Sequence, residues 1–253
     1  MPSLTLAPGR FSPTPQRLRI IRETRRWIAL EKPAGVVGIR EGWASSRVFS
    51  LADALRAEWE AGGAQLRESG WEGIFPICSG DPEGPGIFLL AKTAPDREAL
   101  KNAMGGGEWR FVHQWIAPRQ AGDPPQLRCD LPLARHWQEP RMLVSHKTGK
   151  RTETVFEARA VSRYFTLWEA ISPYLRPHQF RVHALECGLH VPGDALYHPE
   201  APVPPELLRQ VPLAQRTHFH PWRQSALQLN EEEVVTAPPP PGWGKLLKDF
   251  GVT

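Results

Sequence analysis

Cysteine is scarce in this sequence, which has only Cys78, Cys129 and Cys187 among 253 residues. Three cysteines cannot form a complete disulfide framework, and no two of them are spaced as a CxxC pair. The sequence therefore predicts reduced thiols and no structural zinc site.

Long apolar runs are also missing. No segment approaches the ~18 uncharged apolar residues that a membrane span needs, and the N-terminus lacks the apolar stretch of a secretory signal. There is no Walker-type or GxGxxG phosphate loop and no internal repeat. We therefore expect a soluble cytoplasmic protein with no membrane partner.

Positive charge exceeds negative charge only slightly, since 31 Lys and Arg against 27 Asp and Glu give a formal net charge of +4. This excess slightly favours a polyanionic partner. An apolar fraction of 41% is typical of a globular core. Residues 1–16 are rich in proline, so we expect a loose N-terminal arm followed by one domain over residues 17–253, without a preceding RNA-binding module and as a monomer.

Periodicity and turn residues predict more strands than helices. Helices are expected after the N-cap residues Ser50 and Thr93, and before Gly188, because a side-chain oxygen satisfies free amides at a helix start and glycine accepts the left-handed conformation at its end. Strands separated irregularly by helices favour the α+β class. The expected strands are 26–31, 74–78, 87–91, 109–117, 154–162, 165–172, 222–229 and 234–237, and the expected helices are 51–60, 94–104 and 178–187.

Polar side chains crowd one predicted helix and the glycine turn after it, within residues 175–197. Gln179 and His183 are four residues apart and share a helix face, whereas Arg181 points elsewhere, where it can enter a cleft between helix and sheet. A solvated amphipathic helix would show a similar pattern, so the residues alone leave both interpretations open.

The same segment resembles the GRTHQIRVH…GHPIxGDxLYG motif of RluA-type pseudouridine synthases without a gap. Three other segments resemble further motifs of this family: 31–36 its NKPxG strand end, 147–154 its TGKxAxT loop and 220–223 its HAWRL strand. The matching positions in 175–197 are Arg176, His178, Gln179, Arg181, Val182, His183, Gly188, Gly193, Asp194, Leu196 and Tyr197.

Residues 78–92 align with the family's catalytic segment, HRLDxxTSGLLLLAK, and place Asp81 on the catalytic aspartate. By its surroundings alone, Asp81 is a carboxylate on a Gly- and Pro-rich turn between two apolar strands. A turn-capping Asp occurs in the same setting. The resemblance favours the catalytic interpretation.

The resemblance implies a pseudouridine synthase fold, with a mainly antiparallel mixed sheet flanked by helices and loops. It implies isomerisation of uridine to pseudouridine in rRNA or tRNA, with Asp81 as catalytic carboxylate, Arg181 as its ion-pair partner, and no cofactor or metal. RNA is then the expected partner. The implied substrate-binding residues are Lys32, Trp115, Arg176, His178, Gln179 and His183.

Two departures from the family pattern keep an alternative open. Ser79 replaces the arginine of HRLD, and Trp115 replaces the active-site tyrosine, so that an indole could stack on uracil but not exchange a proton. The alternative is a catalytically degenerate, RNA-binding relative. Minor alternatives are Cys78 as a nucleophile and a metal site at His218 and His220, which lie two apart on an expected strand.

Overall fold

The computed structural model describes residues 2–9, 12–40, 42, 48–68 and 70–251. It divides into two compact units, the first formed by residues 1–109 and 226–237 and the second by residues 110–225 and 238–253. The single domain expected over residues 17–253 stays a prediction. No helix in the described part of the chain is long and apolar enough to cross a membrane.

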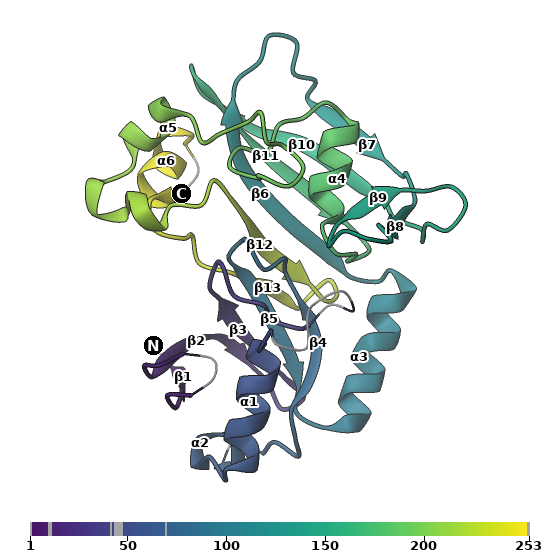
Figure 1. The fold of residues 1–253 in the computed structure, drawn as a ribbon, viewed down its shortest axis with the longest axis vertical. Coiled ribbons are helices and arrows are strands. Elements are labelled where there is room, and N and C mark those ends of the chain that lie inside the picture. The colour runs from purple at the N-terminus through teal and green to yellow at the C-terminus, as the bar shows by residue number, and fades with distance from the viewer. Residues whose placement is uncertain (1, 10–11, 41, 43–47, 69, 252–253) are drawn as a thin grey trace. The chain divides into compact units, whose positions relative to one another are not determined.

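The first unit contains a five-stranded antiparallel sheet in the order β1-β2-β3-β5-β4 (Figure 1). Leu51 and Leu55 of the first helix pack with Leu30 and Phe88 of the central strands in one apolar core. The elements are β1 (Ser3–Leu6), β2 (Gln16–Glu23), β3 (Trp27–Lys32), β4 (Phe75–Ser79), β5 (Gly86–Ala91), α1 (Leu51–Glu60), α2 (Ala64–Glu68) and α3 (Ala94–Gly106).

Both predicted helix starts in this unit are confirmed. Ser50 forms a capping box with Asp53, and the Thr93 side chain accepts a hydrogen bond from the Asp96 amide. Helix α3 continues past the expected Met104 and ends at Gly107, whose φ of 77° is left-handed.

The loose N-terminal arm is a wrong prediction. Ser3–Leu6 forms strand β1 and pairs with β2, and the side chains of Leu4 and Leu6 are buried in the core of the first unit. The alternation of Leu4 and Leu6 with polar residues is a strand pattern too short to recognise without its partner. Pro8, Pro13 and Pro15 lie between the two strands.

The second unit is built on the antiparallel strands β6, β11, β10 and β7, with β12 on the other side of β6 (Figure 1). The last residues of β12 belong to the first unit, where they pair with β13. The elements are β6 (Arg110–Pro118), β7 (Gln126–Cys129), β8 (Leu133–Arg135), β9 (Met142–Val144), β10 (Thr154–Val161), β11 (Phe165–Ser172), β12 (Trp222–Gln228), β13 (Val234–Thr236), α4 (Gln179–Glu186), α5 (Pro205–Gln210), η1 (Leu213–His218) and α6 (Trp243–Asp249).

Both faces of this sheet are buried. Successive strand residues point to opposite faces, so Trp115 packs with Phe180 of α4 whereas Ile116 packs with Trp243 of α6. All eight predicted strands and all three predicted helices are present, with ends shifted by a residue or two, and the α+β class is confirmed.

Candidate active site

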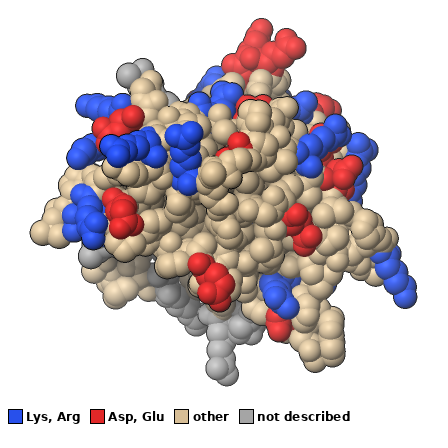
Figure 2. Space-filling model, turned by 90° about the horizontal axis from the view of Figure 1, so that it is seen from above, with Lys and Arg blue, Asp and Glu red and all other residues tan. Residues whose placement is uncertain are grey.

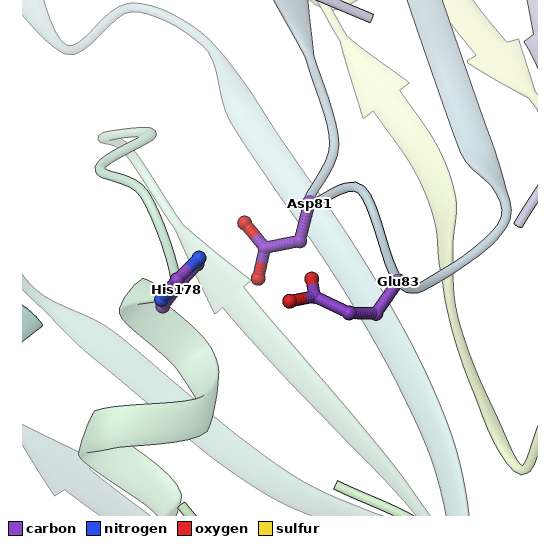
Figure 3. Close-up of side chains that lie close together, drawn as sticks. All are labelled: Asp81, Glu83 and His178. Carbon is purple, nitrogen blue, oxygen red and sulfur yellow. The ribbon is translucent and has the colours of Figure 1, made fainter. Parts of the chain in front are cut away.

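Asp81 lies on the turn that joins β4 to β5 in the first unit, and its side chain is partly buried. Glu83 lies on the same turn and is exposed (Figure 3). Strand β5 after the turn is fully buried beside β3, and β4 before the turn is the edge strand that pairs with β5, so both ends of the turn are held in the sheet. This position agrees with the strand-turn-strand arrangement expected for the catalytic segment.

Lys32, the last residue of β3, holds this turn through hydrogen bonds to its backbone. Its side chain is fully buried. Its ammonium group donates hydrogen bonds to two backbone carbonyls of the loop after β3 and to two of the Asp81 turn. The acceptors are the carbonyl oxygens of Pro33 (2.9 Å), Val36 (3.0 Å), Pro82 (3.2 Å) and Gly84 (2.7 Å). Lys32 therefore positions the turn, and its expected role in binding substrate stays a prediction.

Burial lowers the pKa of Lys32 to about 7, and the negative charges of Asp81 and Glu83 oppose that shift. A neutral amine has one N–H fewer than an ammonium group, so four carbonyl acceptors also favour the charged form. Below pH about 7, Lys32 thus supplies a buried positive charge beside two carboxylates of the same turn.

Cys78 precedes the turn at the end of β4 and is buried. Burial raises the pKa of its thiol to about 12. Because the thiolate is the nucleophilic form, a thiol with this pKa is inert near neutral pH. The structure therefore argues against Cys78 as a nucleophile.

The second unit places His178 directly before α4, in a left-handed conformation with φ 54°. Its side chain is buried, and its Nδ1 lies 2.7 Å from the hydroxyl oxygen of Tyr197 (Figure 3 shows His178). The same hydroxyl oxygen accepts a hydrogen bond from the backbone amide of Met142, and Met142 is the first residue of β9. Tyr197 thereby joins the start of α4 to the β8–β9 hairpin.

Arg181 and Asp194 form a buried ion pair in the second unit. Nε and Nη2 of the guanidinium each donate to one carboxylate oxygen at 2.7 Å, and each side chain is 1% exposed. The guanidinium also lies over the rings of Tyr197 and Trp222, at 5.1 and 5.2 Å. Sequence reasoning matched Asp194 to the motif but assigned it no role.

Gln179 and His183 form hydrogen bonds inside the second unit. The Gln179 amide donates to the Thr154 hydroxyl at 3.1 Å, and that hydroxyl lies 2.9 Å from Nδ1 of His183. Nε2 of His183 lies 2.9 Å from the Leu131 carbonyl oxygen, and burial lowers the pKa of His183, so the neutral ring donates there. Both residues connect α4 to β10, and their expected role in binding substrate stays a prediction.

The chain was compared with known proteins by sequence and by structure. No protein-family model matches it. "Dual-specificity RNA pseudouridine synthase RluA" of Escherichia coli strain K12 is 32% identical over 139 residues, and the protein of that name from Yersinia pestis is 37% identical over 75 residues. The first match covers 53% of this chain and 62% of the relative, and the second covers 28% and 36%, so the chain spans less than two thirds of the length of either relative.

Solved structures show the fold. "Human RNA Pseudouridylate Synthase Domain Containing 4" has a TM-score of 0.65 at 15% identity, with 92% of each chain covered. "Human RNA Pseudouridylate Synthase Domain Containing 1" has a TM-score of 0.57 at 15% identity, with 88% of this chain and 83% of that chain covered. This chain is similar in sequence to RluA pseudouridine synthases over about half of its length, and it has the fold of pseudouridylate synthase domains.

At the position of the RluA-type arginine, Ser79 is packed against the loop after β3. A Cβ at Gly38 would collide with the Ser79 side chain, whose hydroxyl donates to the Gly80 carbonyl oxygen at 3.0 Å. The close approach of the two segments therefore requires glycine at position 38. Nothing in the structure explains the serine at position 79.

Trp115, at the position of the RluA-type tyrosine, is fully buried in the second unit. Its indole stacks on Trp168 at 6.0 Å, lies 5.9 Å from Phe180, and donates from Nε1 to the His190 carbonyl oxygen at 3.0 Å. Stacking on a base needs an exposed ring face. Trp115 has no exposed ring face in this structure, and its role in binding the substrate base stays a prediction.

Two further predicted positions remain. The Arg176 amide donates to Oε1 of Gln179, and the buried Nε of Arg176 has no hydrogen-bond partner among the described residues, so its substrate-binding role stays a prediction. Residues Leu213–His218 form a 3₁₀ helix and not the expected strand, and the His218 side chain lies outside the described residues.

Surface charge is mixed on the face seen in Figure 2. Basic and acidic side chains lie interspersed there over a mostly uncharged surface. That face shows no broad area of one sign, so contact with a polyanion needs a more local feature.

Proposed function

We propose that this protein isomerises uridine to pseudouridine in RNA, with Asp81 as the catalytic carboxylate. The proposal is carried by one observation: the aspartate of the RluA-type motif lies on a clamped turn in a protein with the pseudouridine synthase fold. The relatives named RluA-type synthases support RNA as the substrate, and rRNA and tRNA are the classes in which to look.

The isomerisation of uridine requires one positioned carboxylate and a pocket for the detached base. Asp81 helps to break the bond between C1′ and N1, the uracil turns over, and C5 bonds to C1′ while N1 gains a proton and C5 loses one. A carboxylate can act as nucleophile or base in this sequence, and a pocket that retains the detached uracil keeps it at high effective concentration. The target base must leave its stack, which costs least in an unpaired loop.

Replacing Asp81 with Asn tests the proposal. The amide keeps the shape and loses the negative charge, so we expect pseudouridine formation to be abolished while RNA affinity changes little. Pseudouridine is mapped in total RNA from cells that lack the gene and carry either variant or wild type. Glu83→Gln is the matched control, because it neutralises an exposed carboxylate on the same turn and should retain activity.

Two outcomes would contradict the proposal. Activity retained by Asp81→Asn removes this carboxylate from the mechanism, and loss of activity in both variants means that charge on the turn matters without a specific role for Asp81. The predicted ion pair of Asp81 with Arg181 stays a prediction. Lost stability in Arg181→Met would not test it, because that change also leaves Asp194 buried without its partner.

A catalytically degenerate RNA-binding protein is the second candidate, favoured by the buried indole at position 115. An indole that donates to a backbone carbonyl has no proton to exchange with substrate. RNA that binds the purified protein but gains no pseudouridine, in wild type and in Asp81→Asn alike, would favour this second function.

A further inference from the structure

The β8–β9 hairpin of the second unit carries the most exposed aromatic side chain among the described residues. Trp137 lies at its tip and is 81% exposed. Single exposed apolar side chains are common on protein surfaces, so the significance of this indole depends on what lies around it. We call residues 133–144 the Trp137 hairpin.

The tip that carries Trp137 is an ordered turn. Nδ1 of His136 accepts hydrogen bonds from the amides of Gln138 at 3.3 Å and Glu139 at 3.0 Å, and the His136 amide donates to the Arg141 carbonyl oxygen at 2.9 Å. The indole is therefore presented on a fixed turn. Fixing the backbone before binding lowers the entropy lost when a ligand stacks on the ring.

Basic side chains are frequent in the Trp137 hairpin and in the turn that follows it. Residues 133–151 contain five Lys or Arg side chains and a single acidic one, Glu139. Strand β8 also pairs with Lys150 through a β-bridge, so the turn that follows β9 is attached to the hairpin. The exposed members are Arg135, Lys147, Lys150 and Arg151.

Contacts inside the second unit join the Trp137 hairpin to the helix start described above. The Met142 amide of the hairpin donates to the Tyr197 hydroxyl, which also contacts His178. Tyr197 in turn lies against Arg181. A nucleic acid held by the hairpin would therefore lie beside the motif residues of α4.

We propose that the Trp137 hairpin grips single-stranded RNA, with the Trp137 indole stacked on an unpaired base and the basic side chains on adjacent phosphates. The proposal rests on the function proposed above and adds a stacking contact at Trp137, which lies outside the segments that resemble the family motifs. An exposed aromatic ring among cations is the combination that binds single strands without reading sequence.

The test measures the affinity of the full chain for a fluorescein-labelled, unstructured RNA by anisotropy. Trp137→Ala should weaken binding by about 5- to 150-fold, the range expected for one base stack, and Trp137→Phe should restore most of it. The control is Tyr164→Ala, which removes another exposed aromatic from a different hairpin of the same unit, and it should bind as wild type. Thermal unfolding should be unchanged in all three.

Unchanged affinity in Trp137→Ala would overturn the proposal, and a simultaneous change in its sedimentation would show that the indole contacts another copy of the protein. An equal loss in Tyr164→Ala would also overturn it, because any exposed aromatic would then serve. This failure is separable from failure of the proposed function. Pseudouridine formed by a protein with no Trp137 effect refutes the grip alone, and a Trp137-dependent affinity without pseudouridine refutes the catalysis alone.

Discussion

At the level of single residues, the position of Asp81 depends on one buried cation. Lys32 holds the carbonyls of Pro82 and Gly84, which flank the carboxylate in sequence. Burying a lysine is costly unless its donors are satisfied, and here backbone oxygens satisfy them. Lys32 thus holds the turn that carries the proposed catalytic carboxylate.

The lowered pKa of Lys32 predicts a dependence of stability on pH. With a pKa of about 7 in the folded protein and ~10.4 in the unfolded chain, the unfolded chain binds more protons between these values. The free energy of unfolding should therefore rise with pH from about 7 to about 10, by at most about 1.4 kcal/mol per pH unit from this group. Urea unfolding of wild type and Lys32→Met over this range measures the difference.

Carbon NMR of the Lys32 side chain gives the same pKa directly and serves if Lys32→Met does not fold. A titration near pH 10 would show that the four carbonyl acceptors hold the ammonium charged, and the predicted slope would then be absent.

At the level of elements, helix α4 is fixed by polar contacts more than by an apolar stripe. Thr154 of β10 bonds with both Gln179 and His183, and Gln179 also reaches the Ser172 hydroxyl of β11 at 2.6 Å. A fully satisfied buried network of this kind specifies one arrangement of its members. It sets the rotation of α4 and so directs Arg181 toward Asp194.

Replacing Thr154 with Val should destabilise the protein by about 1–3 kcal/mol, because the isosteric change leaves two buried partners without their hydroxyl. Thr148→Val makes the same change at an exposed threonine of the same loop segment and should cost less than about 0.5 kcal/mol. Denaturant unfolding of the two variants checks this. Equal losses would mean that the network does not hold α4.

Across the whole molecule, the net charge is small, but the charged side chains are unevenly distributed along the chain. The chain carries a formal +4, and the segment 133–151 alone has four more basic than acidic side chains, so the rest of the chain is balanced. Binding to a polyanion then depends on one local segment and on the salt concentration.

This distribution predicts the salt dependence of RNA binding. Neutralising two phosphate contacts with Lys147→Gln and Lys150→Gln should reduce the slope of log affinity against log salt by about 1.4, at ~0.7 per contact on a single strand. The matched control is Lys245→Gln with Lys248→Gln, which removes the same charge from exposed positions of α6. If both double variants change the slope equally, only net charge matters and the segment has no special role.

The sequence by itself determined the features that depend on neighbours along the chain. Ser50 and Thr93 start helices because their hydroxyls cap nearby amides, and the turn that presents Asp81 follows from Gly and Pro between two apolar runs. The motif spacing also carried the family resemblance, which the comparisons confirm.

Only the tertiary structure decided which motif residues face inward. Gln179, His183 and Trp115 have the same identity whether they meet a substrate or a neighbouring strand, and only the structure shows their contacts with the distant residues Thr154, Leu131 and His190. Strand β1 likewise depends on pairing with β2, because four residues carry too little pattern alone. Burial is set by contacts between residues far apart in sequence, and periodicity does not record which of those contacts form.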